Sequence, residues 1–546
     1  MSNSGNKTFV GKILNDFVWS EYKSSQSIYG IAGSSKFKFE FNEFSRMCQA
    51  NLTETAILNF LSSQIGSYGL IVVTDSFIFA ATDHVRSFPI YYVNNPNNFV
   101  VSNYAREAKR SGGIQTVSCL GIDEFLLSGY VHEDRTLYTS LHSLPAGKLL
   151  ILNRQTDSIS ITTHYEYIPE IGTVGKTSEL LAEFDELLNT VFKNLIEDVG
   201  DNDIWVPLSG GLDSRLVVCK LLEHGKKNIH TFTYGNSNSH EMLMARKVAN
   251  QLNVSWSTIS SDTKTLQSIY SDPMRIGYST YADGLHMTPT LLDFEAILRL
   301  YRSNSIAQDS FIVNGYSGDF LFGGHIPEEL ALSSSRELLV SQFTDKNCSN
   351  FYTQKLTSAK QQVKSRLYKT LDSLDCSDYT SEYLCSIYEN WDWAERQTKA
   401  VVNGQRLYEY FEYDWRLPFW NKSLMDFWRQ VPLNLRLNQH LHLLYLRQYN
   451  YLDVFSKLRS TNQIWPTQWR WLQLAGYFTR LMLGKQHKAK FYEYMFYHSY
   501  FNYQLGLFGR NRYNQWYNST RRPRVIPLAA MNRLDEMGIS YHDQIE

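Results

Sequence analysis

An eight-residue segment at positions 207–214, Pro-Leu-Ser-Gly-Gly-Leu-Asp-Ser, constrains the fold of this chain more than any other feature. It follows a short apolar run, residues 204–206, and precedes a helical pattern, residues 215–224, that stops at Gly225. A strand, a glycine turn and a helix N-terminus in this order form a site for an oxyanion, because the first backbone N–H groups of the helix point at the ligand. The segment therefore predicts a phosphate-binding loop in an α/β domain.

The side chains of this loop indicate which ligand it takes. Gly210 and Gly211 let the backbone approach a phosphate without a Cβ in the way, and Ser209 and Ser214 add hydroxyl donors. Asp213 repels a phosphate unless a cation lies between them, so its presence predicts Mg²⁺. No Gly-Lys-Ser/Thr follows, so the segment is not a Walker A loop.

Strands and helices are expected to alternate around this loop. The expected strands cover residues 203–208, 229–234, 254–259 and 310–314, and the expected helices cover 214–224 and 240–252. Such alternation predicts a parallel sheet that binds nucleotide at the carboxyl ends of its strands. An amphipathic helix is expected at 178–197 before the sheet, and a helical pattern from about residue 326 onward.

The first part of the chain is expected to be a separate, β-rich domain, because 546 residues should form two or more domains. The expected strands are 70–73, 77–81, 90–93, 99–102 and 148–152, with a helix at 121–128. Residues 166–178 have the composition of a linker. The predicted domains are therefore 1–165 and 179–546.

Composition excludes several classes of protein. The net charge of −1 argues against a protein that coats nucleic acid, although the arginines of a C-terminal tail rich in aromatics keep phosphate binding open: Arg510, Arg512, Arg521, Arg522 and Arg524. No apolar run reaches the roughly 20 residues that span a membrane, and the N-terminus lacks a signal core, so we expect a cytoplasmic protein. The six cysteines form no Cys-x-x-Cys pair, which favours reduced thiols without a zinc site.

The glycine loop resembles the pyrophosphate-binding loop of the N-type ATP pyrophosphatases, and most of the chain resembles the asparagine synthetase family. Four blocks carry this likeness: 207–214, 232–250, 314–324 and 416–421. The resemblance implies an adenine-nucleotide α-hydrolase-like parallel sheet with a long helical C-terminal extension. It also implies ATP and Mg²⁺, with Asp213 and Asp319 as the metal ligands. The implied nucleotide contacts are Leu208, Ser209, Gly210, Gly211, Asp213, Ser214, Tyr234 and Gly315.

The N-terminal part resembles the family's glutaminase domain at residues 83–92, 129–131 and 144–147. The resemblance implies an Ntn-hydrolase-like β-sandwich flanked by helices. Such glutaminases use a Cys directly after the initiator Met as nucleophile. Here residue 2 is Ser and the nearest cysteine is Cys48, so the domain is expected to be inactive.

Tyr316 stands where asparagine synthetases carry a Glu, and a Tyr there is similar to the β-lactam synthetases, which pair a Tyr with a Glu. A Tyr with its usual pKa near 10 needs a carboxylate partner to act as a base near neutrality. Glu395 is the first candidate for this partner, with Glu382 and Glu389 as alternatives. The other interpretation is that Tyr316 only packs against the nucleotide.

Two further positions depart from the family pattern. Phe320 replaces the acid that follows the metal-binding Asp, and Leu443 stands at the place of a Lys that stabilises negative charge in the transition state. Arg447 is the main candidate to replace that lysine. The other candidate cations are His440, His442, Lys457 and Arg459.

These features predict a synthetase that adenylates a small-molecule carboxylate, releases pyrophosphate and transfers the acyl group to ammonia or an amine without hydrolysing glutamine. A true asparagine synthetase that uses ammonia and a nucleotide-binding scaffold without catalysis stay open, as does a homodimer. A third alternative is a sulfur-transfer or tRNA-modifying enzyme, which would require a catalytic cysteine near the loop. Cys219 lies there, on an apolar helix face that favours a buried structural thiol.

Overall fold

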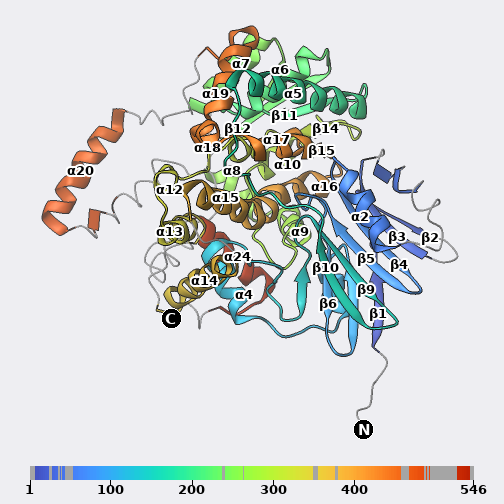
Figure 1. The fold of residues 1–546 in the computed structure, drawn as a ribbon. Helices are drawn as coiled ribbons and strands as arrows, with labels where there is room; N and C mark the ends of the chain where they lie inside the picture. The colour runs from blue at the N-terminus through green and yellow to red at the C-terminus, as the bar shows by residue number, and fades with distance from the viewer. Residues whose placement is uncertain are drawn as a thin grey trace.

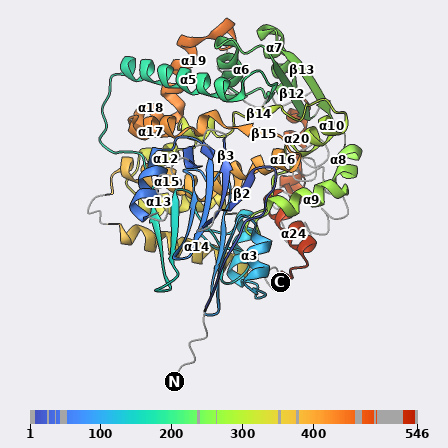
Figure 2. The ribbon, with the colours of Figure 1, turned by 90° about the vertical axis from the view of Figure 1, so that its right-hand side faces the viewer.

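The computed structural model of the protein describes residues 7–23, 27–34, 37–38, 40–42, 53–235, 240–261, 263–348, 354–374, 379–456, 467–484, 487–488, 491 and 525–541. The N-terminal sheets occupy one end of the molecule, and a parallel sheet covered by helices occupies the other (Figures 1 and 2). This arrangement confirms the predicted α/β fold class.

Two sheets form the N-terminal part. The first has the order β1 (Thr8–Lys12), β7 (Asn98–Ser102), β6 (Tyr91–Asn94), β8 (Leu141–Ser143). The second has the order β10 (Ser158–Thr163), β9 (Lys148–Asn153), β5 (Phe77–Thr82), β4 (Tyr68–Thr74), β3 (Ser27–Gly33), β2 (Trp19–Lys23). All pairs are antiparallel except β1 with β7. The sequence predicted β4, β5, β6, β7 and β9 and missed the others.

Alternation along the strands explains why these sheets stack. On β4, Ile71 belongs to the same buried cluster as Phe99 of β7, whereas its neighbours Leu70 and Val72 pack with Ile57 of helix α2 (Glu54–Ser63). Successive side chains of a strand point to opposite faces. One face of the second sheet therefore packs against the first sheet, and the other face is covered by α2.

The C-terminal sheet is fully parallel and has the order β13 (Ser255–Ser260), β12 (Ile229–Gly235), β11 (Ile204–Pro207), β14 (Phe311–Val313), β15 (Asp414–Arg416). The first four strands were predicted to within a residue or two. The edge strand β15 was not, because three residues, Asp-Trp-Arg, are too few to show an alternating pattern in a region of helical composition.

The order of these strands fixes the place of the site. The chain leaves β11 toward β12 on one side of the sheet, while β14 pairs with β11 on the other side. Ligands of open α/β sheets bind where the strand order reverses in this way, outside the carboxyl ends of the strands. The loops after β11 and β14 are therefore neighbours, although about a hundred residues separate them in the chain.

Helices surround the parallel sheet. Helix α5 (Thr177–Val199) buries the stripe Phe184, Leu188, Phe192 and Leu195, close to the predicted helix at 178–197. The other helices that follow are α6 (Asp213–Glu223), α7 (His240–Leu252), α8 (Thr263–Tyr270), α9 (Pro273–Ala282), α10 (Phe294–Arg302), α11 (Gly318–Leu321), α12 (Glu328–Ala331), α13 (Arg336–Asn347), α14 (Gln354–Ser373), α15 (Ser381–Trp391), α16 (Arg406–Tyr410), α17 (Lys422–Gln430), α18 (Leu433–Arg436), α19 (His440–Tyr449), α20 (Thr467–Leu483) and α24 (Val525–Met537). A π-helix, Asp392–Val401, continues α15.

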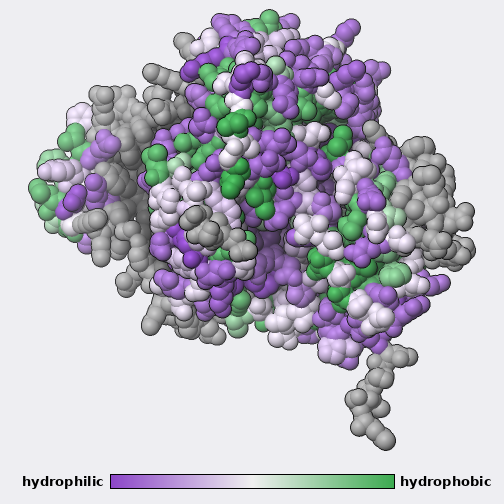
Figure 3. Space-filling model, viewed as in Figure 1, coloured by the Kyte–Doolittle hydropathy of each residue, from purple (hydrophilic) through white to green (hydrophobic). Residues whose placement is uncertain are grey.

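The chain returns to its first half near its end. Helix α24 packs on α4 (Cys119–Ser128) through a shared apolar cluster, and it lies beside α4 in Figure 1. Its Met537 also packs against a second cluster that contains residues of α3 (Ala105–Ser111). No pattern in the sequence predicted this contact. Figure 3 shows hydrophilic residues over much of one face, which is hollowed near its centre. Within the described ranges, no helix has the length and apolar character needed to cross a membrane.

Candidate active site

The predicted phosphate-binding loop lies at the carboxyl end of β11 and leads directly into α6. Hydroxyl groups organise the turn: the Ser209 N–H donates to Ser214 Oγ at 3.1 Å, and the Gly211 N–H donates to Ser209 Oγ at 3.1 Å. Among the described residues, no side chain caps the start of α6. Its first N–H groups therefore remain open to a ligand, as an oxyanion site requires.

Contacts from behind hold this loop in place. Arg215 is buried and donates to the carbonyl of Gly210 at 3.1 Å and to that of Val454 at 2.7 Å. Leu208 donates its N–H to Phe232 of the neighbouring strand at 2.9 Å. The backbone that would meet a phosphate is thus fixed before any ligand arrives.

The loop after β14 packs directly onto the first loop. A methyl group at Gly315 would lie 2.8 Å from the Ser214 nitrogen, and one at Gly318 would lie 2.6 Å from Asp213 Cγ. Real Cβ atoms do not approach other atoms so closely, so glycine is required at both positions. These glycines bring Asp319, the second residue of α11, against Asp213.

The two carboxylates predicted to bind metal therefore meet. Asp213 accepts a hydrogen bond from the backbone N–H of Asp319, and burial together with the charge of Asp319 raises the pKa of the Asp213 carboxyl to about 8. A cation between two such groups relieves their repulsion. Within the described part of the chain, no group of three or more His, Cys, Asp or Glu residues could hold a metal. Mg²⁺ fits this pair, because it takes one or two carboxylates and completes its shell with water and phosphate oxygens.

His325 connects this pair to a second buried carboxylate. Its Nε2 lies 3.0 Å from Asp319 Oδ2 and its Nδ1 lies 2.7 Å from Asp392 Oδ2. Burial lowers the pKa of His325, but the hydrogen bonds to Asp319 and Asp392 outweigh it and leave the pKa raised. Sequence reasoning missed His325 and Asp392, and the only signal was the position of His325 directly after two glycines.

Tyr316 reaches a carboxylate that the sequence did not single out. Its hydroxyl donates to Asp293 Oδ2 at 2.8 Å, the Tyr408 hydroxyl donates to the same oxygen at 2.7 Å, and the Tyr234 hydroxyl donates to Asp293 Oδ1. Burial and the charge of Asp293 raise the pKa of Tyr316 well above its usual value. The Tyr316 hydroxyl therefore keeps its proton at neutral pH. It can accept a second proton only if its own proton passes to Asp293 at the same time.

The fold and these contacts accompany a clear family match. Residues 184–451 match the family model for asparagine synthase. This segment belongs to the asparagine synthase family. The match contains both loops, both carboxylates predicted to bind metal and the cluster around Asp293. No curated protein sequence matches the chain significantly.

Three solved structures show weak likeness to the chain. An NH3-dependent NAD synthetase from Campylobacter jejuni subsp. jejuni is 18% identical over 40% of this chain and 93% of that one, with a TM-score of 0.20. An NMN synthetase from Francisella tularensis is 14% identical over 49% and 97%, with a TM-score of 0.19. The allosteric regulatory enzyme of purine biosynthesis is 10% identical with a TM-score of 0.19, and the chain spans 62% of its length.

The expected partner of Tyr316 in this asparagine synthase segment is corrected by the structure. Glu395 lies on the π-helix and accepts from Lys399 Nζ at 2.6 Å and from the Glu133 N–H at 2.9 Å, so it anchors the N-terminal part of the chain. The alternatives also have other roles. Glu382 accepts from the Gly172 N–H at 3.1 Å, and buried Glu389 lies 3.5 Å from Arg436. Asp293, at the start of α10, is the carboxylate partner of Tyr316 in place of the predicted Glu395.

The cations proposed to replace the family lysine lie on or near α19. Arg447 and His440 are exposed, and Arg447 makes no hydrogen bond or ion pair with the described residues. His442 is buried with its ring 4.0 Å from that of Phe322, and burial lowers its pKa to about 3, so it is neutral. The prediction that His442 could supply positive charge is therefore wrong. The other candidates lie outside the described residues: Lys457, Arg459 and the tail arginines.

Two other departures have structural explanations. Phe320, in place of an acid, is buried among Tyr167, Trp420 and His325. Cys219 is fully buried, and burial raises the pKa of its thiol to about 12. The prediction of a structural thiol is confirmed, and this finding argues against sulfur transfer through Cys219.

Segment 83–87, which resembles the glutaminase domain, connects the two halves of the molecule. The Asp83 carboxylate accepts the backbone N–H groups of three residues. The ring of His84 contacts the carbonyl of Trp420 at 2.6 Å, and Arg406 donates to the carbonyl of Ser87 at 2.6 Å. This segment therefore holds the synthase-family part in place. Ser2 and Cys48, on which the expectation of an inactive glutaminase domain depends, lie outside the described residues.

Proposed function

We propose that the protein is an ATP-dependent, amide-forming synthetase that adenylates a small carboxylic acid. The observation that carries the proposal is the contact between the loops after β11 and β14, which brings Asp213 and Asp319 together beside an open helix N-terminus. That combination suits a nucleotide triphosphate with its metal. The family match of residues 184–451 supports it.

In the proposed first step, a carboxylate oxygen of the acid attacks the α-phosphorus of ATP. A new oxygen–phosphorus bond forms, the bond to the pyrophosphate oxygen breaks, and the acyl-adenylate results. Gly210, Gly211 and the hydroxyls of Ser209 and Ser214 hold the departing pyrophosphate by hydrogen bonds. Asp213 and Asp319 would hold Mg²⁺, which would supply positive charge for the phosphates. Leu208, Gly315 and Tyr234 line the nucleotide side.

In the proposed second step, ammonia or an amine attacks the acyl carbon and AMP leaves with the electron pair of the broken carbon–oxygen bond. The attacking nitrogen must lose a proton. Tyr316 can take it while its own proton moves to Asp293, because the two oxygens are 2.8 Å apart. Arg447 stays a candidate for stabilising negative charge in the transition state. Because its side chain is exposed, this role needs a movement of the Arg447 side chain or of the nucleotide. In this proposal the nitrogen comes from ammonia or an amine and not from glutamine hydrolysed by the N-terminal part.

The two-domain division at residues 166–178 and a cytoplasmic location belong to the same proposal. The N-terminal part acts in it as a structural element without glutaminase activity. Its segment 83–87 supports this role through the contacts with Arg406 and Trp420.

The test is Mg²⁺-dependent binding of an ATP analogue that resists cleavage between its α- and β-phosphates. Isothermal titration calorimetry measures this binding. We expect the wild type to bind the analogue only with Mg²⁺, and Asp213→Asn and Asp319→Asn to lose that dependence. Asp201→Asn is the matched control, because Asp201 is exposed just before the opposite end of β11. Magnesium-dependent binding that persists in both site variants contradicts the metal assignment.

A nucleotide-binding scaffold is the second candidate. Phe320 in place of the family's acid and Leu443 in place of its lysine favour it, because both substitutions remove charge that the family uses. The two functions differ in turnover. Incubation with Mg²⁺-ATP, a panel of carboxylic acids and hydroxylamine produces hydroxamate and pyrophosphate only if the protein forms an acyl-adenylate. A scaffold binds the nucleotide and produces neither.

A further inference from the structure

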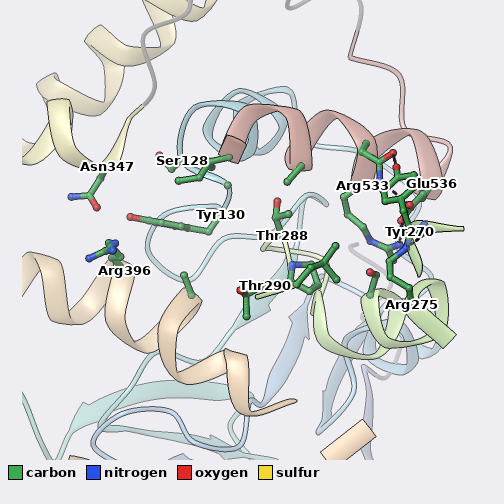
Figure 4. A pocket seen from close by; sticks show the side chains of 18 of the residues that line it. Ser128, Tyr130, Tyr270, Arg275, Thr288, Thr290, Asn347, Arg396, Arg533 and Glu536 are labelled. Carbon is green, nitrogen blue, oxygen red and sulfur yellow. Dashed lines mark hydrogen bonds and ion pairs between the residues drawn. The ribbon is translucent and has the colours of Figure 1, made fainter. Parts of the chain in front are cut away.

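A cavity of about 200 Å³ lies between α4, α9, the π-helix and α24, beside the candidate active site (Figure 4). At one end its polar side chains satisfy one another. Arg275 and Arg533 both form ion pairs with Glu536, and the Tyr270 hydroxyl donates to Asn532. This end therefore has little capacity left for a polar ligand.

The opposite end contains polar atoms without partners. Tyr130 Oη, Asn347 Oδ1 and Arg396 Nη1 are buried and have no hydrogen-bond partner within the described part of the chain. The exposed fractions of Tyr130 and Asn347 are only 3% and 6%. Figure 4 shows the Tyr130 hydroxyl pointing toward Arg396 and Asn347. Buried polar groups are nearly always hydrogen-bonded, so three orphans converging at one place indicate a ligand site.

The chemistry of this end favours an anion. The neighbouring Lys346 donates to Asp392 at 3.2 Å, whereas Arg396 has no ion pair with any described residue. Burial raises the pKa of Tyr130 well above its usual value, so its hydroxyl is a donor at neutral pH. Two donors, one of them charged, suit a carboxylate.

The middle of the cavity is apolar. Its walls include Leu291, Ile526, Ala529 and Ala400. Helix α24 comes close enough to require a glycine: a methyl at Gly129 would lie 2.7 Å from Ile526 Cγ2. A ligand here has a hydrophobic body next to its anionic group.

The anionic end adjoins the nucleotide loops. Lys346 contacts Asp392, Asp392 contacts His325, and His325 contacts Asp319, so three contacts link the cavity to the metal-site carboxylate. Thr290 on the cavity wall is also near Tyr316, since a methyl at Gly404 would lie 3.3 Å from Thr290 Cγ2 and 3.8 Å from Tyr316 Cε2. An acid in this cavity is within one layer of side chains of the adenylation site.

We infer that this cavity binds a small monocarboxylic acid with an apolar body, whose carboxylate accepts hydrogen bonds from Arg396 and Tyr130. Asn347 Oδ1 accepts from a donor group on the ligand where one is present. The inference goes beyond the proposed function and does not rest on it, because Lys346, Asp392 and His325 lie between this carboxylate and the nucleotide loops. The binding itself requires no nucleotide.

The test uses calorimetry on the full-length protein without ATP, with 3-phenylpropanoate and 4-methylpentanoate as probes. The matched control ligand is 3-phenylpropanamide, which has the same body and no charge. We expect the amide to bind roughly tenfold more weakly than its acid or worse, as loss of a charged hydrogen bond implies. Failure of both acids to bind, or equal binding of acid and amide, overturns the inference.

Variants separate the ligand site from the fold. Arg396→Gln should lose at least about tenfold in affinity for the acid, while Arg480→Gln, on the exposed α20, should lose none. Tyr130→Phe should weaken acid binding and leave the Tm of the empty protein unchanged or higher, because it removes an unpartnered buried hydroxyl. Unchanged affinity in Arg396→Gln overturns the inference, and so does a fall in Tm for Tyr130→Phe without loss of acid affinity.

Failure of the inference and failure of the proposed function have different signatures. Acid binding that depends on Arg396, in a protein that does not bind Mg²⁺-ATP, supports the cavity site and rejects the synthetase. Mg²⁺-ATP binding that depends on Asp213, in a protein indifferent to the charge of the acid, supports nucleotide binding and rejects the cavity site.

Discussion

At the scale of single residues, the buried carboxylate of Asp293 organises the acceptor side of the candidate site. Three tyrosine hydroxyls, those of Tyr234, Tyr316 and Tyr408, donate to its two oxygens. Asn314 supports the arrangement through its side-chain contact with the Tyr408 hydroxyl at 3.0 Å. A carboxylate with several donors is held in one position, so Tyr316 has little freedom to turn away.

Replacing Tyr316 with Phe tests whether its hydroxyl does more than hold this carboxylate. We expect Tyr316→Phe to spare ATP–pyrophosphate exchange and to slow amide formation by about 10²–10⁴-fold, the usual worth of general base catalysis. Tyr408→Phe is the matched control, because Tyr408 donates to the same Asp293 oxygen at 2.7 Å. If the two variants behave alike in both half-reactions, Tyr316 is a structural donor and not a base.

At the scale of secondary-structure elements, α19 attaches to the core through His442. This side chain is fully buried between the rings of Phe322 and Phe184, and burial alone lowers its pKa to about 3. The unfolded chain binds a proton near the ordinary pKa of 6.5, and the folded protein does not. His442 therefore costs stability as the pH falls below 6.5, and the cost stops growing near pH 3.

Replacing His442 with Leu should remove this acid sensitivity. The free energy of unfolding of the wild type should fall, relative to that of His442→Leu, by about 2 kcal/mol between pH 6.5 and about pH 5. Urea unfolding at both pH values measures the difference. His440→Leu on the exposed side of α19 is the control and should leave the pH dependence unchanged. A parallel pH dependence of wild type and His442→Leu contradicts the assignment of a neutral imidazole.

At the scale of the whole molecule, a buried ionic cluster ties together three distant segments. The carboxylate of Asp283, after α9, accepts hydrogen bonds from two arginines. Arg106 of α3 donates at 2.7 and 2.8 Å, and Arg533 of α24 donates at 2.6 Å. The Asp283 side chain is 1% exposed. A single apolar cluster also includes residues of the N-terminal sheets and of the parallel sheet, such as Phe99 and Val206. The two halves are thus joined by charge as well as by apolar packing.

Removing the charge of Asp283 should destabilise the entire protein. Asp283→Asn leaves the partly buried Arg106 without its anion and the buried Arg533 with Glu536 alone, and breaking a buried pair costs about 3–5 kcal/mol. We expect a lower Tm, with both halves unfolding in one transition. Differential scanning calorimetry measures the Tm and the number of transitions. Asp157→Asn is the control, because Asp157 is half exposed in its pair with Lys7 and should change stability by less than about 1 kcal/mol. Separate transitions for the two halves argue against this coupling.

The sequence by itself determined the features that depend on neighbours in the chain. The strand, glycine turn and helix around residues 207–214 are local, so the phosphate loop and the strands beside it were predictable. Asp213 was predictable for the same reason, whereas Asp319 was predicted from the resemblance of residues 314–324 to the asparagine synthetase family. The N-terminal strands β1, β2 and β3 were missed, since their short runs lack a clear alternation.

Only the tertiary structure decided which side chains meet across long sequence separations. Asp293 replaces Glu395 as the partner of Tyr316 because α10 starts beneath the β14 loop, and no local pattern encodes that packing. The return of α24 to α4 creates the cavity with Tyr130 and Arg396 in the same way. The burial that makes His442 neutral also depends on rings from α5 and the α11 loop. Contacts and burial are properties of the folded chain, whereas a motif records only the order of its residues.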